Sequence, residues 1–147
     1  MEMTVEKLAP VIVVTLTYIL LYYLFLLNVL RAKILVVRQC RERGKQFNRY
    51  EHDYPELKAA DRVQLNMLEH MPTFLVALWL QAFFVSVESA TWLGTIYIFI
   101  RATYPLFLGT SLERNIPMRL LINTFSGYFV HLVMVFWTGW VALGHLF

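Results

Sequence analysis

Residues 62–72 have the sequence RVQLNMLEHMP and lead directly into the apolar run FLVALWL of residues 74–80. An apolar run of this kind, continued to about residue 87, predicts a membrane-spanning helix. At about 100° per residue, Arg62, Asn66 and Glu69 share one face of this helix, with Thr73 one turn deeper and Gln64 on the opposite side. Ionisable side chains inside a membrane helix cost roughly 2.5 to 3.5 kcal/mol each on insertion scales. The stretch therefore indicates a polar site near one membrane surface, facing protein or a polar ligand.

The rest of the chain has the composition of a membrane protein. Of its 147 residues, 59% are hydrophobic and 16% are aromatic, which exceeds the roughly half-apolar composition of soluble domains. Four apolar stretches each have the roughly 20 residues that a bilayer crossing needs. With their polar extensions they predict helices at about 8–38, 62–87, 91–112 and 118–146. The predicted fold is all-α, an integral membrane four-helix bundle that forms a single membrane domain over residues 1–147.

Turn and cap signals set the start of the second predicted helix. The segment Tyr54-Pro55-Glu56-Leu57 indicates a turn, because the residue before a proline is disfavoured in helical geometry. Asp61 is then the expected N-cap. Within the second and third helices, Pro72 and Pro105 each remove a backbone hydrogen bond, so both positions predict a kink.

Basic residues gather on two of the three predicted connections. Nine of the 13 Lys and Arg residues lie in or beside the connection between the first two helices, and Arg114 and Arg119 lie between the last two. The connection between the second and third helices has only Glu88. By the positive-inside rule, both basic connections are expected in the cytoplasm and both termini on the opposite side. Setting topology beside anionic lipid is sufficient to explain most of these basic residues.

The third predicted helix carries a second unusual polar position, Arg101, about halfway along its length. Tyr104 follows at i+3, and Tyr97 and Leu108 fall on the same face. An arginine at this depth needs a partner or a polar cavity. Glu69 on the antiparallel second helix is one candidate, so a structural Arg101–Glu69 ion pair remains open beside a ligand site.

The sequence indicates neither a metal site nor a nucleic-acid site. Cys40 is the single cysteine, which excludes an intrachain disulfide and a thiolate metal cluster. The four histidines have no ligand spacing. The basic residues are explained by membrane topology, so no nucleic-acid partner is expected.

At these positions the chain resembles the MAPEG family, the membrane-associated proteins in eicosanoid and glutathione metabolism, which include microsomal glutathione transferases and leukotriene C4 synthase. The most specific part is the pattern Arg-x-x-x-Asn-x-x-Glu-x-x-Pro, which Arg62, Asn66, Glu69 and Pro72 meet. The resemblance implies a homotrimer with sites between neighbouring subunits, near the cytosolic face and open sideways to lipid. It implies the endoplasmic reticulum in a eukaryote or the inner membrane in a bacterium.

The resemblance also implies glutathione as co-substrate, and the residue types suit that ligand. Arginine grips carboxylates bidentately, Glu69 suits the ammonium group, and Asn66 can satisfy an amide. The residues that the resemblance assigns to glutathione binding are Arg31, Arg62, Gln64, Asn66, Glu69, Arg101 and Tyr104.

In the family, catalysis uses the glutathione thiolate, and an arginine after the third helix stabilises it. Lowering the pKa of the thiol from about 8.5 to about 6.5 needs roughly 2.7 kcal/mol of preferential anion stabilisation. Here Arg114 and Arg119 flank Pro117. Arg114 is the first choice for this role and Arg119 the alternative. The chain departs from many relatives at Leu108, where they have a second tyrosine.

The implied function is that of a glutathione transferase, or a glutathione-dependent peroxidase, acting on lipophilic electrophiles or hydroperoxides that enter from the bilayer. The alternative is a non-catalytic lipid-binding membrane module that resembles the five-lipoxygenase-activating protein. Leu108 favours this alternative, whereas Arg62 and Glu69 oppose it, because that branch departs from the pattern at those places. A third hypothesis is a small transporter that uses Arg101 and Glu69 as a charge relay.

Overall fold

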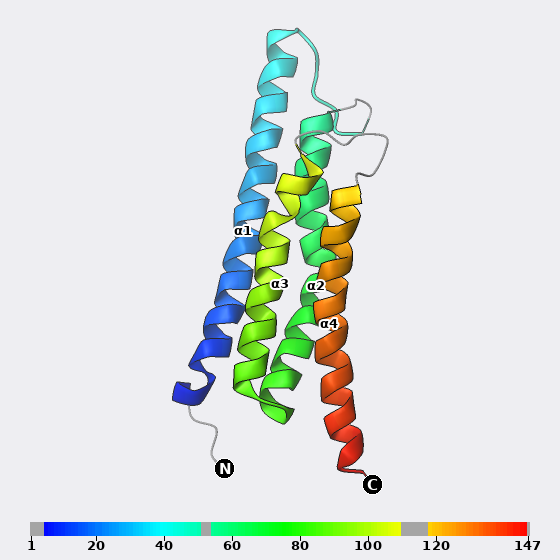
Figure 1. The fold of residues 1–147 in the computed structure, drawn as a ribbon. Helices are drawn as coiled ribbons and strands as arrows, with labels where there is room; N and C mark the ends of the chain where they lie inside the picture. Colours follow the sequence, from blue (N-terminus) through cyan, green and yellow to red (C-terminus); the bar gives the residue numbers. More distant parts are fainter. Residues whose placement is uncertain (1–4, 51–53, 110–117, 147) are drawn as a thin grey trace.

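The computed structural model describes residues 5–50, 54–109 and 118–146 and shows four helices, α1 (Val5–Glu42), α2 (Pro55–Phe84), α3 (Val87–Leu108) and α4 (Met118–Gly144) (Figure 1). No strand occurs in these described residues. The helices run alternately in opposite directions, so α1 ends and α2 begins at the same end of the bundle where α3 ends and α4 begins (Figure 1). The structure confirms the predicted all-α four-helix bundle.

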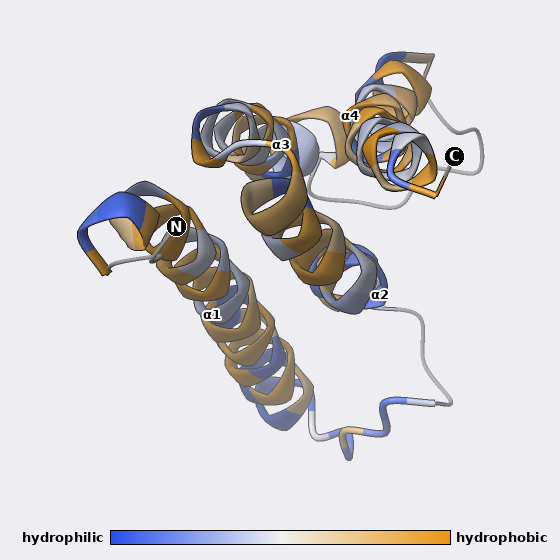
Figure 2. Cartoon of the chain, turned by 90° about the horizontal axis from the view of Figure 1, so that it is seen from below, coloured by the Kyte–Doolittle hydropathy of each residue, from blue (hydrophilic) through white to orange (hydrophobic). Residues whose placement is uncertain are grey.

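α2 and α3 form the centre of the bundle. Each contacts all three other helices, whereas α1 and α4 make no contact with each other within the described residues. Figure 2 shows α1 and α4 on opposite sides of the α2 and α3 pair. Side chains that α2 and α3 turn toward each other are therefore enclosed by helices on both sides.

The outer surface of the bundle is suited to lipid. By length and composition, α1, α2 and α4 can each cross a membrane. All four helices expose large apolar side chains; Phe99 is 70% exposed and Phe129 is 68% exposed. α3 is less apolar than these three helices need to be for a membrane crossing on composition alone, although its 22 residues span about 33 Å. Its buried face carries Tyr97, Arg101 and Tyr104, which lower its hydropathy.

The start of α2 differs from the sequence-based expectation. The helix begins at Pro55, and the residue before it, Tyr54, occupies the N-cap position without a side-chain cap. The expected turn at residues 54–57 and the expected N-cap at Asp61 are therefore wrong. Proline suits the first helical position because its missing N–H has no partner there in any case. Asp61 lies inside the helix, where it accepts a hydrogen bond from Arg49 at 2.6 Å.

The other helix ends lie within a few residues of those expected. α1 covers 5–42 where about 8–38 was expected, α3 covers 87–108 where about 91–112 was expected, and α4 ends at Gly144. The expected end of α2 near residue 87 is too late because Ser86 caps α3: its side chain accepts a hydrogen bond from the backbone N–H of Ser89 at 3.0 Å.

Two contacts bring α1, α2 and α3 close together. Gly94 of α3 faces Val14 of α1 and Leu78 of α2, and a Cβ at this glycine would lie 2.7 Å from a Val14 methyl and 2.8 Å from a Leu78 methyl. Tyr18 of α1 donates a hydrogen bond to the backbone carbonyl of Met67 in α2 at 3.0 Å. The second contact fixes the register of α1 beside residues 62–72, the segment on which the site depends.

α1 extends past the other helices at the end where α2 begins (Figure 1). Its 38 residues are about 57 Å long, well beyond the roughly 30 Å hydrocarbon core of a bilayer. The extension packs on the start of α2 through Val36, Cys40 and Leu57. The first turns of α2 are thereby held in place beside α1.

Candidate functional site

Arg101 is at the centre of the candidate site. Its side chain is 1% exposed. Nη1 donates to Oδ1 of Asn66 in α2 at 2.6 Å, and Nη2 donates to the hydroxyl of Tyr97, one turn earlier in α3, at 2.9 Å. The guanidinium carbon also lies 4.9 Å from the centre of the Tyr97 ring, a geometry that favours a cation–π contact. Nε has no hydrogen-bond partner.

The charge of Arg101 is not balanced by a carboxylate. Among the described residues, the salt bridges involve only Arg38 with Glu42 and Arg49 with Asp61. The Arg101–Glu69 ion pair, which the sequence left open as one alternative, is therefore not formed in the described part of the chain. The physical reason is burial. The oxygen of Asn66 faces inward and accepts the hydrogen bond from Arg101, whereas Glu69 is exposed on the outside of α2.

α4 closes the other side of Arg101 with small and amide side chains. A Cβ at Gly127 would lie 3.4 Å from Nη2 and 3.5 Å from Cζ of Arg101, so the helix passes directly over the guanidinium. One turn earlier, Asn123 donates to the carbonyl of Ile100 at 3.1 Å and to the hydroxyl of Thr103 at 3.0 Å. Its Oδ1, like Nε of Arg101, is buried without a partner.

The outer face of α2 carries the second half of the site. Arg62 and Glu69 are exposed, and Asn66 lies between them with 5% of its surface exposed. Oδ1 of Asn66 is bound to Arg101, whereas Nδ2 has no hydrogen-bond partner among the described residues and is not fully buried. The face therefore presents a cation, an amide donor and a carboxylate in successive turns. We call these three residues the α2 polar face.

The other residues assigned to glutathione lie elsewhere in the single chain. Gln64 faces α1, where its Nε2 donates to the hydroxyl of Tyr22 at 3.1 Å. Arg31 is exposed on α1 and lines a separate groove of about 470 Å³ between α1, α2 and α3. Tyr104 is 4% exposed and packs in an apolar cluster of α2, α3 and α4 residues. Of the seven predicted binding residues, only Asn66 and Arg101 share a hydrogen bond.

The two candidate thiolate-stabilising arginines differ in what the structure describes. Arg119 is exposed in the first turn of α4. Arg114 lies in 110–117, outside the described residues. Arg119 is thus placed at the end of the bundle where α2 begins (Figure 1), the end that also carries the start of the α2 polar face.

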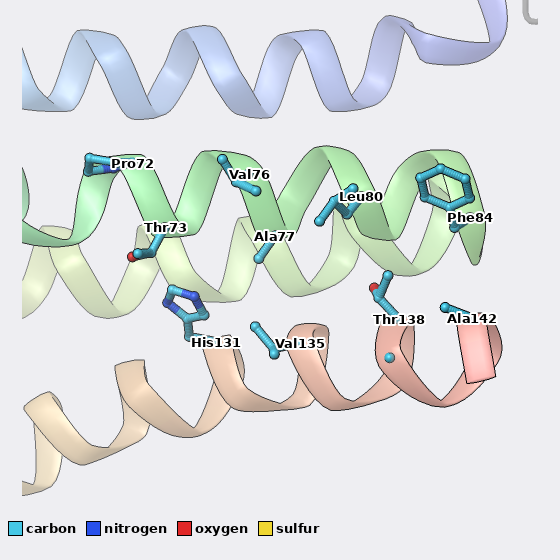
Figure 3. Close-up of a pocket in the computed structure, with 11 residues that line it drawn as sticks. Pro72, Thr73, Val76, Ala77, Leu80, Phe84, His131, Val135, Thr138 and Ala142 are labelled. Atoms are coloured by element: carbon cyan, nitrogen blue, oxygen red, sulfur yellow. The ribbon is translucent and has the colours of Figure 1, made fainter.

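A large apolar groove begins one turn beyond Glu69, between α2 and α4. Its volume is about 650 Å³. Figure 3 shows Thr73 and His131 near one end and Phe84 and Ala142 near the other. The lining between these ends is almost entirely aliphatic, so the groove can hold an elongated apolar molecule rather than a polar one.

Several residues of this region were not assigned by sequence reasoning. Tyr97 lies on the Arg101 face of α3, but its hydrogen bond to the guanidinium was not foreseen. Asn123 and Gly127, one turn apart on α4, carry no motif; an asparagine within a spanning helix was the only available signal. Gln81, with no exposed surface, donates to Ser89 at 3.0 Å and accepts from Thr138 at 2.8 Å.

A four-helix bundle with three membrane-capable helices, in which α2, α3 and α4 enclose an arginine–asparagine pair, defines an integral membrane protein with a polar site between its helices. The sequence model of the MAPEG family matches residues 9–140, and the chain belongs to this family. No curated protein matches the chain. The family contains glutathione transferases and peroxidases as well as non-catalytic members, so membership supports a membrane function related to glutathione or lipid.

Proposed function

We propose that this protein is a glutathione transferase, or a glutathione-dependent peroxidase, acting on lipophilic electrophiles or hydroperoxides from the bilayer. The observation that carries the proposal is the α2 polar face, on which Arg62, Asn66 and Glu69 present a cation, a donor and an acceptor above the buried Arg101. Family membership supports glutathione as the ligand.

The chemistry of glutathione matches this face group by group. A carboxylate of the tripeptide binds the Arg62 guanidinium, and the ammonium group binds Glu69. The Nδ2 of Asn66 donates to an oxygen between them. Because the thiolate is the nucleophile, an arginine at the start of α4 or just before it, Arg119 or Arg114, stabilises the sulfur anion. The thiolate then attacks the electrophilic carbon, a C–S bond forms, and the displaced group leaves with its electron pair.

The α2–α4 groove accommodates the lipophilic substrate. It begins one turn beyond Glu69 and continues along α2 to Phe84. The apolar chain of the substrate lies in this groove, while its reactive end extends past Glu69 toward the end of the bundle where α4 begins and Arg119 lies. Entry from the bilayer requires no passage through water.

A homotrimer accounts for the residues that a single chain separates. Gln64 and Arg31 lie on faces of the chain that do not meet the α2 polar face. In a site between two subunits, these two residues reach the ligand from the neighbouring copy. The proposal therefore includes an assembly of three chains with a glutathione site at each boundary.

The test is titration of the detergent-purified protein with glutathione, followed by both binding heat and thiolate absorbance. We expect Arg62→Gln and Glu69→Gln each to raise the Kd for glutathione at least tenfold, because each loses one charged contact worth about 1.4 kcal/mol. Arg38→Gln is the matched control, since Arg38 is an exposed cation paired with Glu42 on α1. Unchanged affinity in both α2 variants would refute the proposed function.

The thiolate signal at neutral pH then separates the two arginines. Arg114→Ala and Arg119→Ala are compared under saturating glutathione. We expect one of them to lose the thiolate absorbance while retaining binding, which assigns the stabilising role. Binding without a thiolate signal in the wild-type protein would contradict catalysis through an activated thiol.

A non-catalytic lipid-binding module is the second candidate. The observation that favours it is Leu108, which packs with Tyr104 in an apolar cluster and provides no second hydroxyl near the ligand. A protein that binds fatty acid in the α2–α4 groove, but shows no glutathione-dependent turnover of any electrophile tested, would favour this candidate over the enzyme.

A further inference from the structure

Arg101 and Asn66 form a pair whose chemistry allows only one orientation. An asparagine amide has an acceptor oxygen on one side and a donor NH₂ on the other. A guanidinium has donors only and does not lose its proton in proteins. Only the oxygen of Asn66 can therefore face Nη1 of Arg101 at 2.6 Å. The reverse orientation would place two donors against each other inside the bundle.

Tyr97 of α3 and the backbone of α4 hold the Arg101 guanidinium in place. Nη2 is bound to Tyr97, and α4 passes over the guanidinium at Gly127, where a side chain would begin only 3.4 Å away. With 1% of its surface exposed, Arg101 is shielded from any ligand on the outside of α2. Its influence on a ligand must pass through Asn66.

We infer that Arg101 is a positioning residue that fixes the Asn66 amide with Nδ2 facing outward, so that the site selects a ligand with an acceptor oxygen between its anionic and cationic groups. The inference rests on the proposed function and deepens it by assigning the central contact. It gives Arg101 an indirect role in place of the direct glutathione contact expected from the sequence.

The selection follows from the order of groups on the α2 polar face. Arg62 can bind a carboxylate and Glu69 an ammonium group, and free amino acids and many peptides have both groups. A carbonyl or carboxylate oxygen opposite Nδ2 of Asn66 adds a third requirement at the centre. A tripeptide such as glutathione meets all three, whereas a ligand with a donor at the central position meets an unfavourable donor–donor contact.

Asn66→Asp is the decisive variant, because it separates folding from recognition. The new carboxylate can pair with Arg101, so the bundle keeps its interior contact and the melting temperature is expected to stay the same or rise. The outward donor is lost, however, and an acceptor replaces it. We expect the Kd for glutathione to rise at least tenfold. Gln39→Glu, on the exposed face of α1, is the control for one added negative charge.

A thermal-stability cycle tests the orientation without any ligand. Asn66→Asp is combined with Arg101→Gln, and Arg101→Lys serves as the conservative variant. We expect Asn66→Asp to destabilise the Arg101→Gln protein but not the wild-type protein, because its carboxylate is then buried without a cation. Lysine at position 101 should preserve part of both the stability and the glutathione affinity.

The outcomes distinguish this inference from the proposed function. Wild-type-like glutathione affinity in a stable Asn66→Asp protein would overturn the inference and leave the proposed function intact. A wild-type protein that binds no glutathione would overturn the proposed function and with it the selection of the tripeptide. Absence of coupling between positions 66 and 101 in the stability cycle would overturn the orientation in either case.

Discussion

At the scale of single residues, the molecule stabilises a buried cation with neutral groups. The amide oxygen of Asn66, the hydroxyl and ring of Tyr97 and the open position at Gly127 surround Arg101 without a carboxylate. A buried ion pair would cancel the charge, whereas these partners leave it in place. The interior behind the α2 polar face therefore keeps a donor-only cation, and the oxygen of Asn66 has to stay turned toward it.

A second buried polar residue, Gln81, joins three helices and gives a prediction about stability. Gln81→Leu should lower the free energy of unfolding by about 1 kcal/mol, because the partly buried hydroxyls of Thr138 and Ser89 lose their amide partner. The additional change Thr138→Val should restore part of this loss, since removing both partners is less costly than removing one. Equilibrium unfolding in detergent measures both; strictly additive losses would contradict the network seen between Gln81 and Thr138.

Sequence reasoning drew attention to Asn66 and Arg101 but did not predict the hydrogen bond between them. Asn66 and Arg101 were conspicuous because polar groups are costly in spanning helices. Their hydrogen bond depends on the register between antiparallel α2 and α3, and a shift of one residue would turn a different side chain inward. Glu69, only three residues from Asn66, was thus an equally reasonable partner for Arg101 until the register was known.

At the scale of elements, α3 is placed by a close approach to α1 and α2. Gly94→Ala should destabilise the protein by about 1–3 kcal/mol through overpacking, although alanine favours a helix over glycine by about 1 kcal/mol. The clash involves Val14 and Leu78, so Val14→Ala should recover part of the loss. Thermal unfolding measures these effects against Gly139→Ala, where no atom lies within 4 Å of the added Cβ. Equal stability of the two alanine variants would contradict the role given to Gly94.

Helix type and approximate length were predictable from the sequence, whereas the start of α2 was not. A run of about 20 apolar residues predicts a spanning helix regardless of its neighbours. The segment before it is polar, and the extension of α1 supports it through Val36, Cys40 and Leu57. This tertiary contact allows α2 to begin at Pro55, where the local signal alone indicated a turn.

At the scale of the whole molecule, the distribution of charge agrees with the arrangement of the helices. α1 and α3 end, and α2 and α4 begin, at the same end of the bundle (Figure 1), as expected if both basic connections lie on one side of the membrane. The α2 polar face begins near this end and continues inward, and Arg119 lies there as well. Under the proposed function, glutathione would approach from this membrane surface, while the apolar substrate would enter the α2–α4 groove from the bilayer.

The exposed position of Glu69 in a single chain leads to a prediction about assembly. Glu69 lies seven residues beyond Arg62, about 10 Å further along α2, beside the apolar groove. A carboxylate at this depth is costly against lipid, so we expect a second copy of the chain to cover it, and sedimentation in detergent to give the mass of a trimer.

Spin labels at Glu69→Cys and Phe99→Cys, in a Cys40→Ser background, test whether lipid or protein surrounds Glu69. The label at 99 should be accessible to oxygen dissolved in the bilayer, whereas the label at 69 should be shielded from it and accessible to a water-soluble relaxation agent. Equal oxygen accessibility at both positions would mean that Glu69 faces lipid, and the site would then have to be complete within one chain.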